Sequence, residues 1–167
     1  VYDVAAFGEI LIDFTAQTPN DQGQMLFARN PGGAPANVAV AARRLGAKTA
    51  FLGKAGQDMQ GVFLRSVLEQ EQVDVSGMIL DDRYFTTLAF VEVNEAGERT
   101  FSFARKPGAD TQITPEELNL GVLEYTKILH IGSLSLTDQP IRDTTFYAVK
   151  YAKKHGILIS YDPNYRA

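Results

Sequence analysis

The chain has 167 residues and 45% of them are hydrophobic, which is enough for one soluble domain with a substantial core. Its formal net charge of −4 and the lack of a basic stripe argue against nucleic acid as a partner, and the absence of cysteine excludes disulfides, thiolate catalysis and cysteine-based zinc sites. No apolar run approaches the roughly 20 residues that span a bilayer, and the first residues show no signal-sequence pattern, so we expect a cytoplasmic protein without membrane contact.

The first elements in chain order are predicted to be strands. The mostly apolar run from Val4 to Asp13 indicates one strand that is buried on both faces, as in a parallel sheet. Asp13 closes this run, where a carboxylate serves either as a turn residue or helix cap, or as an acceptor for two neighbouring hydroxyl groups of a ligand. The segments 14–18 and 25–29 are candidates for a short two-stranded ribbon.

Residues 31–39, with the sequence PGGAPANVA, are the most informative segment of the chain. Gly32 and Gly33 permit backbone angles that other residues avoid, and they leave room for a ligand to approach the backbone. Pro35 suits the first position of a helix, so Asn37 lies in the first turn beside amides with partial positive charge. The segment predicts a pocket wall, although an ordinary helix start after a glycine turn fits the same spacing. The apolar face of this helix is predicted to carry Val38, Ala41, Ala42 and Leu45.

These glycines belong to neither of the two common phosphate-binding loops. The chain contains no Gly-x-Gly-x-x-Gly string after a strand and no Gly-Lys-Ser/Thr at a helix start. Because the residues after the double glycine are small and neutral, a small polar ligand fits this segment better than a nucleotide does.

Strand and helix patterns alternate through the rest of the chain, which predicts an α/β sandwich with a mainly parallel sheet. The stretches 86–93 and 98–103 read as a β-hairpin, which is either a separate ribbon or an antiparallel edge of the main sheet. Other strands are expected at 49–52, 128–131 and 157–159. A helix is expected after the N-cap Asp58, and the residues on its apolar face are Met59, Val62, Phe63, Ser66 and Val67. A short helix is expected after the capping box Thr114–Glu117. A third helix is expected over 140–155, with Gly156 as the stop.

Four segments share their sequence and order with one enzyme family. They are FGEILIDF at 7–14, GGAPANVA at 32–39 with Gly46 and Gly56 at their spacings, FARKPGAD at 103–110, and YDPNYR at 161–166. The glycine-rich segment resembles the first signature of the ribokinase-like carbohydrate kinases, the pfkB family, and the other three are similar to fructokinase segments. The resemblance extends over essentially the whole chain.

The resemblance implies a ribokinase-like three-layer α/β/α sandwich with a mainly parallel sheet, together with a small β-sheet lid. In such kinases the lid covers the sugar and often pairs with the lid of a second subunit. Segments of about 14–30 and 84–105 are therefore expected to form the lid of a homodimer. The implied reaction is transfer of the γ-phosphoryl group of ATP to a sugar hydroxyl, with Mg²⁺ on the nucleotide phosphates.

Members of this family are nearly twice as long as this chain, and a second signature in their C-terminal half carries the catalytic aspartate and the anion hole. That signature does not occur in the 167 residues. The resemblance leads us to expect the N-terminal part of a carbohydrate kinase domain, with the catalytic base beyond Ala167. On this view the isolated chain is inactive, and ATP and Mg²⁺ bind mainly to the C-terminal part. A non-catalytic sugar-binding or dimerising module is the alternative.

The site residues of the family are carried over to matching positions of this chain. The resemblance assigns sugar binding to Asp13, together with Gly32, Gly33 and Asn37 of the matched signature. Two further sugar-site candidates come from residue type and position: Phe101, whose ring suits sugar C–H groups, and Arg105, which follows the predicted hairpin. The resemblance assigns the region where sugar and phosphates meet to Asp162, Asn164 and Arg166. From residue type alone, either arginine fits a solvated surface equally well, and Phe101 fits packing within a lid or dimer. No metal site is expected, because two isolated histidines do not make one.

Two departures from the ribokinase pattern bear on the sugar. Ribokinases usually have an asparagine where Leu11 stands and a lysine where Ala34 stands, so the corresponding pocket is less polar here. This argues against ribose and leaves fructose, or an acidic keto sugar such as 2-keto-3-deoxygluconate. The fructokinase-like segments favour fructose, converted to fructose 6-phosphate.

Overall fold

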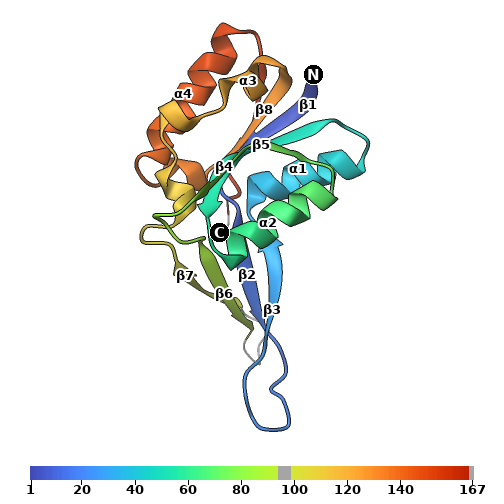
Figure 1. The fold of residues 1–167 in the computed structure, drawn as a ribbon, viewed down its shortest axis with the longest axis vertical. Coiled ribbons are helices and arrows are strands. Elements are labelled where there is room, and N and C mark those ends of the chain that lie inside the picture. Colours follow the sequence, from blue (N-terminus) through green and yellow to red (C-terminus); the bar gives the residue numbers. More distant parts are fainter. Residues whose placement is uncertain (94–98, 166–167) are drawn as a thin grey trace.

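Five parallel strands form the larger of two sheets in the computed structural model, which describes residues 1–93 and 99–165 (Figure 1). The strand order is β5-β4-β1-β8-β9, with β1 in the centre. The strand bounds are β1 Tyr2–Phe7, β4 Thr49–Gly56, β5 Asp74–Asp81, β8 Thr126–Gly132 and β9 Leu158–Asp162. The predicted strands at 49–52, 128–131 and 157–159 are confirmed as parts of this sheet.

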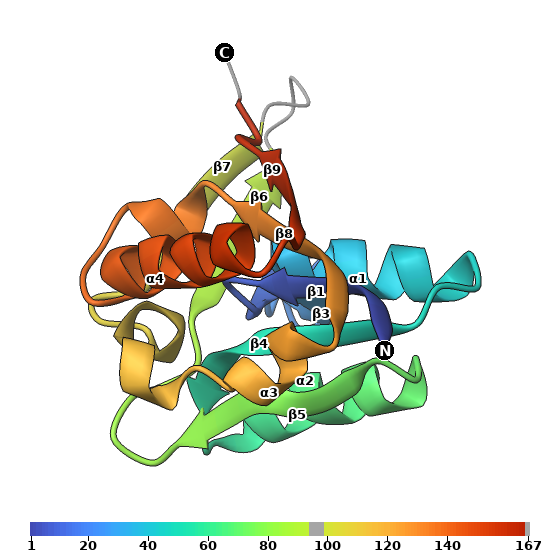
Figure 2. The ribbon, with the colours of Figure 1, turned by 90° about the horizontal axis from the view of Figure 1, so that it is seen from above.

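Helices cover both faces of the five-stranded sheet, because successive side chains of its central strands point to opposite faces. In β1, Ala5 and Phe7 belong to one apolar core and Ala6 belongs to the other. The first core is covered by α3 (Leu120–Glu124) and α4 (Ile141–Lys154), and the second by α1 (Ala34–Arg44) and α2 (Met59–Gln70). Figure 2 shows α4 and α1 on opposite sides of β1. The three-layer α/β/α sandwich is thus confirmed.

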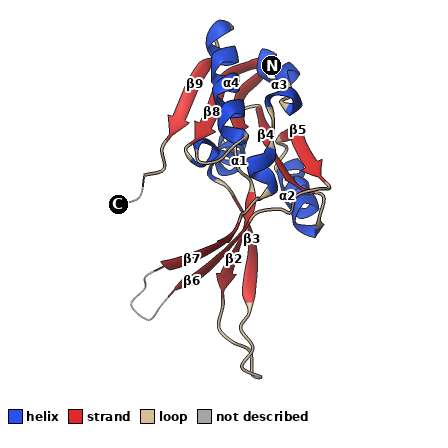
Figure 3. Cartoon of the chain, turned by 90° about the vertical axis from the view of Figure 1, so that its left-hand side faces the viewer, coloured by secondary structure: helices blue, strands red, loops and turns tan. Residues whose placement is uncertain are grey.

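A separate, mixed sheet of four strands projects from one end of this sandwich (Figure 3). Its order is β3-β2-β6-β7, and only the β2–β6 pair among these neighbours is parallel. The bounds are β2 Leu11–Ala16, β3 Phe27–Gly32, β6 Leu88–Val93 and β7 Arg99–Ala104. The predicted ribbon and hairpin therefore join in one small sheet, and neither is an edge of the main sheet. The connection between the two predicted hairpin strands, residues 94–97, lies outside the described residues.

The prediction of a single strand from Val4 to Asp13 is wrong. The chain leaves the main sheet after Phe7 and enters the small sheet at Leu11. Gly8 makes this break: its φ is 149°, and a Cβ atom there would lie 2.8 Å from Cγ of Pro35. Hydrophobicity does not reveal the break, because Ile10 and Ile12 are buried in the α1–α2 core. Asp13 is therefore the third residue of β2 and not the end of a parallel strand.

The predicted apolar faces of α1 and α2 are also wrong. Leu45 is 89% exposed and Met59 is 72% exposed, whereas small residues such as Ala36 and Ala39 lie against the sheet. In α1 these small residues let the helix approach the strands closely, whereas α2 turns Leu64 and Leu68 toward the core in place of the predicted face. The N-cap prediction is confirmed, because Asp58 accepts hydrogen bonds from two backbone amides of α2. None of the helices within 1–93 and 99–165 is long and apolar enough to cross a membrane.

A fully buried lysine joins the main sheet to the connection that follows the small sheet. Nζ of Lys54 in β4 donates to Oδ2 of Asp81 in β5 at 3.0 Å and to Oε1 of Glu117 at 2.7 Å. Glu117 ends the 3₁₀ helix η2 (Pro115–Glu117), where the predicted capping box with Thr114 is confirmed. Two further 3₁₀ helices are η1 (Ala109–Gln112) and η3 (Leu134–Leu136). Hydrogen bonds from Arg83, then those from its backbone amide and Lys54, hold the pKa of Asp81 well below its usual range.

Removing the carboxylate of Asp81 is expected to destabilise the fold. Asp81→Asn leaves the buried Lys54 with less compensating charge, so we expect a loss of about 3 kcal/mol in the free energy of unfolding at pH 7. Because the folded-state pKa is depressed, this stabilisation is present above the unfolded-state pKa and is lost as the pH falls below about 4. Urea titrations from pH 7 to pH 3 measure both effects. The exposed Arg65–Glu69 pair supplies the control, since Glu69→Gln is expected to cost less than about 0.5 kcal/mol. Equal losses in the two variants would contradict this account.

Candidate functional site

The strand order of the main sheet identifies a place where a ligand is expected. From the central β1 the chain adds β4 and β5 on one side, and then β8 and β9 on the other. In open parallel sheets, ligands bind outside the carboxyl ends of the strands at such a switch of direction. A cavity of about 320 Å³ lies there, lined by Glu9 after β1, Ala34 at the start of α1, and Ser133 and Leu134 after β8. We call it the switch-point cavity.

Two aromatic side chains of the small sheet form another wall of the switch-point cavity. Phe101 and Phe103 lie two residues apart on β7 and stack with their ring centroids 6.2 Å apart. Asp13, Ala89 and Phe103 are directly opposite one another across β2, β6 and β7. Side chains opposite one another share a face of a sheet, so Asp13 lies on the face that carries both phenylalanines. The small sheet thus presents a carboxylate and two aromatic rings on one side.

The Gly32–Gly33 turn joins β3 to α1. It packs against two residues of the segment that leads from β1 into the small sheet, Glu9 and Asp13. A Cβ atom at Gly32 would lie 2.3 Å from Oδ2 of Asp13, so the Asp13 carboxylate packs against this glycine. Gly33 has a φ of 108°, and a Cβ atom there would lie 2.4 Å from the carbonyl oxygen of Glu9. The close neighbours of both glycines in this structure are protein atoms, so the approach of a ligand to this backbone stays a prediction.

Asn37 lies away from the switch-point cavity. Its side chain is exposed and lines a neighbouring groove between α1 and α2, with a volume of about 610 Å³. Gly32 lines this groove too, while Ala34 lines the switch-point cavity. The predicted sugar-binding residues thus lie on both sides of the glycine turn.

Arg105 is held by protein acceptors. Its side chain is only 11% exposed, and its Nε donates to Oδ2 of the buried Asp110 at 2.9 Å. Nη1 donates to Oδ2 of Asp138 at 3.2 Å and to Thr137, and Nη2 donates to the carbonyl oxygen of Leu134 at 3.4 Å. Every nitrogen of the guanidinium therefore has an acceptor. Arg105 links the end of the small sheet to the chain after β8, beside the switch-point cavity.

The end of β9 reaches the same cavity through Asn164. The side chain of Asn164 lines it, and the backbone amide of Asn164 donates to Oδ1 of Asp162 at 2.8 Å. Ser133 donates to the carbonyl oxygen of Pro163 at 2.7 Å, which holds the chain after β9 against the chain after β8. Arg166 lies outside the described residues.

Glu9 is a cavity residue that the sequence analysis missed. It is 4% exposed, and its Oε1 accepts a hydrogen bond of 3.0 Å from the backbone amide of Ala34, the first residue of α1. Burial raises the pKa of Glu9, and Asp110 raises it further, whereas backbone amides and Arg105 act in the opposite direction. A carboxylate inside the otherwise apolar run FGEILI was the available signal, because burying a charged group is costly unless it has a task.

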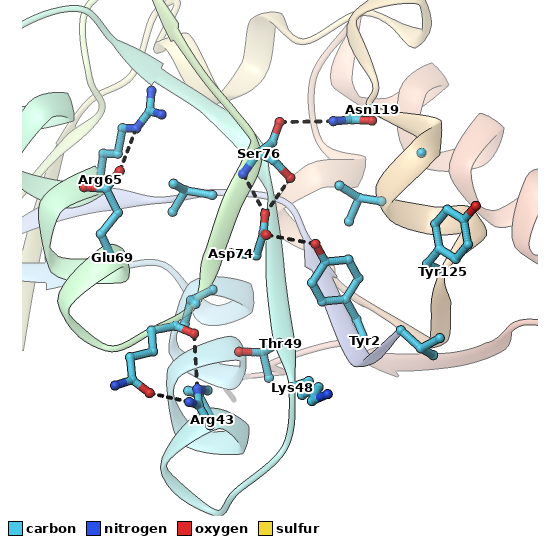
Figure 4. Close-up of a pocket in the computed structure, with 16 residues that line it drawn as sticks. Tyr2, Arg43, Lys48, Thr49, Arg65, Glu69, Asp74, Ser76, Asn119 and Tyr125 are labelled. Carbon is cyan, nitrogen blue, oxygen red and sulfur yellow. Dashed lines mark hydrogen bonds and ion pairs between the residues drawn. The ribbon is translucent and has the colours of Figure 1, made fainter.

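A second cavity, of about 900 Å³, lies at the opposite ends of the strands of the main sheet (Figure 4). It is lined by the first residues of three strands, Tyr2, Thr49 and Asp74. Its polar groups largely pair with one another: the Tyr2 hydroxyl donates to Asp74 at 2.8 Å, and Asn119 donates to the carbonyl oxygen of Ser76 at 3.1 Å. This cavity lies at the amino ends of the strands, whereas open parallel sheets bind ligands at the carboxyl ends. We therefore place the candidate site at the switch-point cavity.

The comparisons with known proteins agree with this fold and site. Residues 2–167 match the pfkB family carbohydrate kinases. The chain is 45% identical to a probable fructokinase-2 of Arabidopsis thaliana, over 98% of this chain and 50% of that protein. Two crystal structures of a fructokinase from Xylella fastidiosa superpose on it. The first has a TM-score of 0.93 and 39% identity, over 98% of this chain and 51% of that chain. The second, with bound ATP, has a TM-score of 0.92 and 38% identity, over 99% of this chain and 53% of that chain.

The three-layer sandwich with its small sheet is thus the fold of a carbohydrate kinase. The chain belongs to the pfkB family. It spans about half the length of the curated relatives that it matches.

The Gly33 position gives a direct test of the turn. Gly33→Ala is expected to cost more than about 3 kcal/mol, because positive-φ strain is added to a clash with the Glu9 backbone. Gly46→Ala is the matched control: its φ is 95°, but a Cβ atom there has no neighbour within 4 Å, so we expect a loss of about 1–2 kcal/mol. Chemical denaturation measures both variants, and a smaller loss for Gly33→Ala than for Gly46→Ala would refute the close packing.

Proposed function

We propose that this chain is the sugar-binding half of an ATP-dependent fructokinase that forms fructose 6-phosphate. The observation that carries the proposal is the switch-point cavity, which is closed on one side by the face of the small sheet that bears Asp13 and Phe103. The similarity to fructokinases over almost the entire chain supports the choice of sugar.

The residues around the cavity supply groups suited to a neutral sugar. The Asp13 carboxylate is an acceptor for two neighbouring hydroxyls, and such charge-assisted hydrogen bonds are strong. Phe101 and Phe103 offer apolar faces to the C–H groups of the ring. Gly32 and Gly33 bring the backbone near the sugar, with Asn37 behind them. Segments 14–30 and 84–105 act as a lid that excludes water.

ATP is proposed as the phosphoryl donor, with Mg²⁺ carried on its phosphates to neutralise their charge. Within 1–93 and 99–165, no group of three His, Asp or Glu side chains is placed to hold a metal ion, so we assign no step of the reaction to a metal bound by this chain. Asp162 and Asn164, at the end of β9, are proposed to lie near the point where the transferred phosphoryl group meets the sugar. The catalytic base is proposed to lie in sequence beyond Ala167.

Arg105 bears on the choice between fructose and 2-keto-3-deoxygluconate. An acidic sugar needs a cation for its carboxylate, but Arg105 already donates to Asp110 and Asp138. Recognition of the acid by Arg105 therefore requires loss of a protein ion pair. A neutral sugar requires no such exchange, which supports fructose.

Steady-state kinetics of the full-length protein test the sugar and the role of Asp13. We expect fructose to exceed ribose and 2-keto-3-deoxygluconate in kcat/KM. Asp13→Asn keeps the shape but loses charge-assisted acceptance, which is expected to cost about 1.5–3 kcal/mol per lost bond and so lower kcat/KM for fructose roughly 10- to 100-fold.

A preference for the acidic sugar would overturn the fructokinase proposal, and unchanged kinetics in Asp13→Asn would remove Asp13 from the sugar site. The 167-residue chain alone is expected to release no ADP above the no-sugar control. Sugar-dependent ADP release by the chain alone would overturn the placement of the base beyond Ala167, and a full-length protein that binds sugar without turnover would indicate a non-catalytic module.

We also propose that the small sheets of two copies form a homodimer. Apolar residues lie on both faces of the small sheet: Phe90 stacks on Phe14 on one face, and Phe101 and Phe103 lie on the other. The second pair is 42% and 55% exposed, so a partner has apolar surface to cover. Light scattering of the full-length protein is expected to give twice the protomer mass. A monomer at every concentration would contradict the proposal.

A further inference from the structure

Three buried side-chain atoms in the described part of the chain have no hydrogen-bond partner: Oε2 of Glu9, Oγ1 of Thr49 and Nε2 of His130. Of the three residues, Glu9 lines the switch-point cavity, whereas Thr49 lines the cavity at the opposite edge of the sheet. The reaction proposed above gives Glu9 no task. A buried carboxyl oxygen without a donor is costly, so its position beside a candidate ligand site calls for an explanation.

The two oxygens of Glu9 have different surroundings. Oε1 accepts the hydrogen bond from the Ala34 amide, at a helix start where the partial positive charge of the backbone favours a carboxylate. This bond fixes one end of the carboxyl group. Oε2 is then left buried and without a donor, in a residue that lines the cavity together with Ala34, Phe101 and Phe103. A cavity whose lining includes a carboxyl group with a spare acceptor and two aromatic rings matches a ligand that has hydroxyl groups and an apolar ring face.

We propose that Oε2 of Glu9 accepts a hydrogen bond from a hydroxyl group of the bound sugar, which makes Glu9 a second substrate-binding carboxylate beside Asp13. The inference rests on the proposed function, because it assigns the ligand of the same cavity. It also joins two parts of the site: one carboxyl group holds the first residue of α1 through Oε1 and the sugar through Oε2. The sugar is thereby positioned relative to the glycine turn.

Glu9→Gln in the full-length protein separates this role from a purely structural one. The amide keeps the size of the side chain and an oxygen for the Ala34 amide, but it replaces the acceptor at the cavity with an NH₂ group. We expect KM for fructose to rise about 10- to 100-fold, while KM for ATP stays within about twofold of the wild type. Glu124→Gln, an exposed glutamate on α3, is the matched control and is expected to leave both values unchanged.

A second measurement needs no variant that must fold. Titration of fructose into the wild-type protein, observed through the side-chain carboxyl ¹³C resonance of Glu9, is expected to shift that resonance with the same Kd as calorimetry gives. Monodeoxy fructose analogues then complete a double-mutant cycle with Glu9→Gln. One analogue is expected to lose much less affinity relative to fructose in Glu9→Gln than in the wild type, because the bond is already missing in the variant, and equal losses for every analogue would contradict the proposal.

The outcomes separate the two proposals. A wild-type protein that uses fructose, together with an unchanged fructose KM in Glu9→Gln or a Glu9 resonance that fructose does not shift, would overturn the Glu9 inference and leave the fructokinase proposal intact. A wild-type protein that neither binds nor phosphorylates fructose would overturn both.

Discussion

The close packing of the first turn of α1 against the ends of β1 and β8 determines where everything else in this fold lies. Pro35 approaches so closely that a Cβ atom at Gly8 would lie 2.8 Å from it, and one at Gly132 would lie 3.5 Å away. With the helix this near, the backbone of Glu9 contacts Gly33, and the chain between them must leave the main sheet. The small sheet and the switch-point cavity are both consequences of this contact.

The small sheet is tied to the sandwich at three places by buried or half-buried polar contacts. Its first strand begins after Glu9, whose Oε1 accepts a hydrogen bond from the Ala34 amide at 3.0 Å, and its third strand begins after Thr86, whose amide donates to Oδ2 of Asp58 at 2.8 Å. Its last strand is followed by Arg105, which is held by Asp110. Because Asp58 also caps α2, the same carboxylate fixes a helix start and the entry to the sheet. The position of the sheet over the cavity is thus set by polar contacts at its base, while its far end extends away from the sandwich (Figure 3).

Sequence patterns predict the elements of this fold better than their packing. Asp58, Gly156 and the capping box at Thr114 act through local chemistry, so their helix boundaries follow from the sequence. The inward face of α1 does not, because the alanines that pack against the sheet carry little hydrophobic signal. In α2, Leu64 and Leu68 face the core, and apolar residues on both sides of the helix left the sequence without a clear choice of face. The break at Gly8 was hidden because both sides of it are buried. Glu9 was missed for a related reason: its role depends on Ala34, which is 25 residues away in the chain.

The distribution of charge around the cavity gives a physical reason for a neutral substrate. Glu9 lines the cavity, Asp13 lies on the face of the small sheet that carries Phe101 and Phe103, and the guanidinium of Arg105 is already compensated by Asp110 and Asp138. A substrate carboxylate would add negative charge to a site where burial already opposes ionisation of Glu9. It would have to displace the half-exposed Asp138 to reach Arg105, because Asp110 is fully buried and also bonded to Thr87. A neutral hydroxyl group adds no negative charge beside these carboxyl groups, so a polyhydroxylated neutral sugar suits this arrangement better than an acid does.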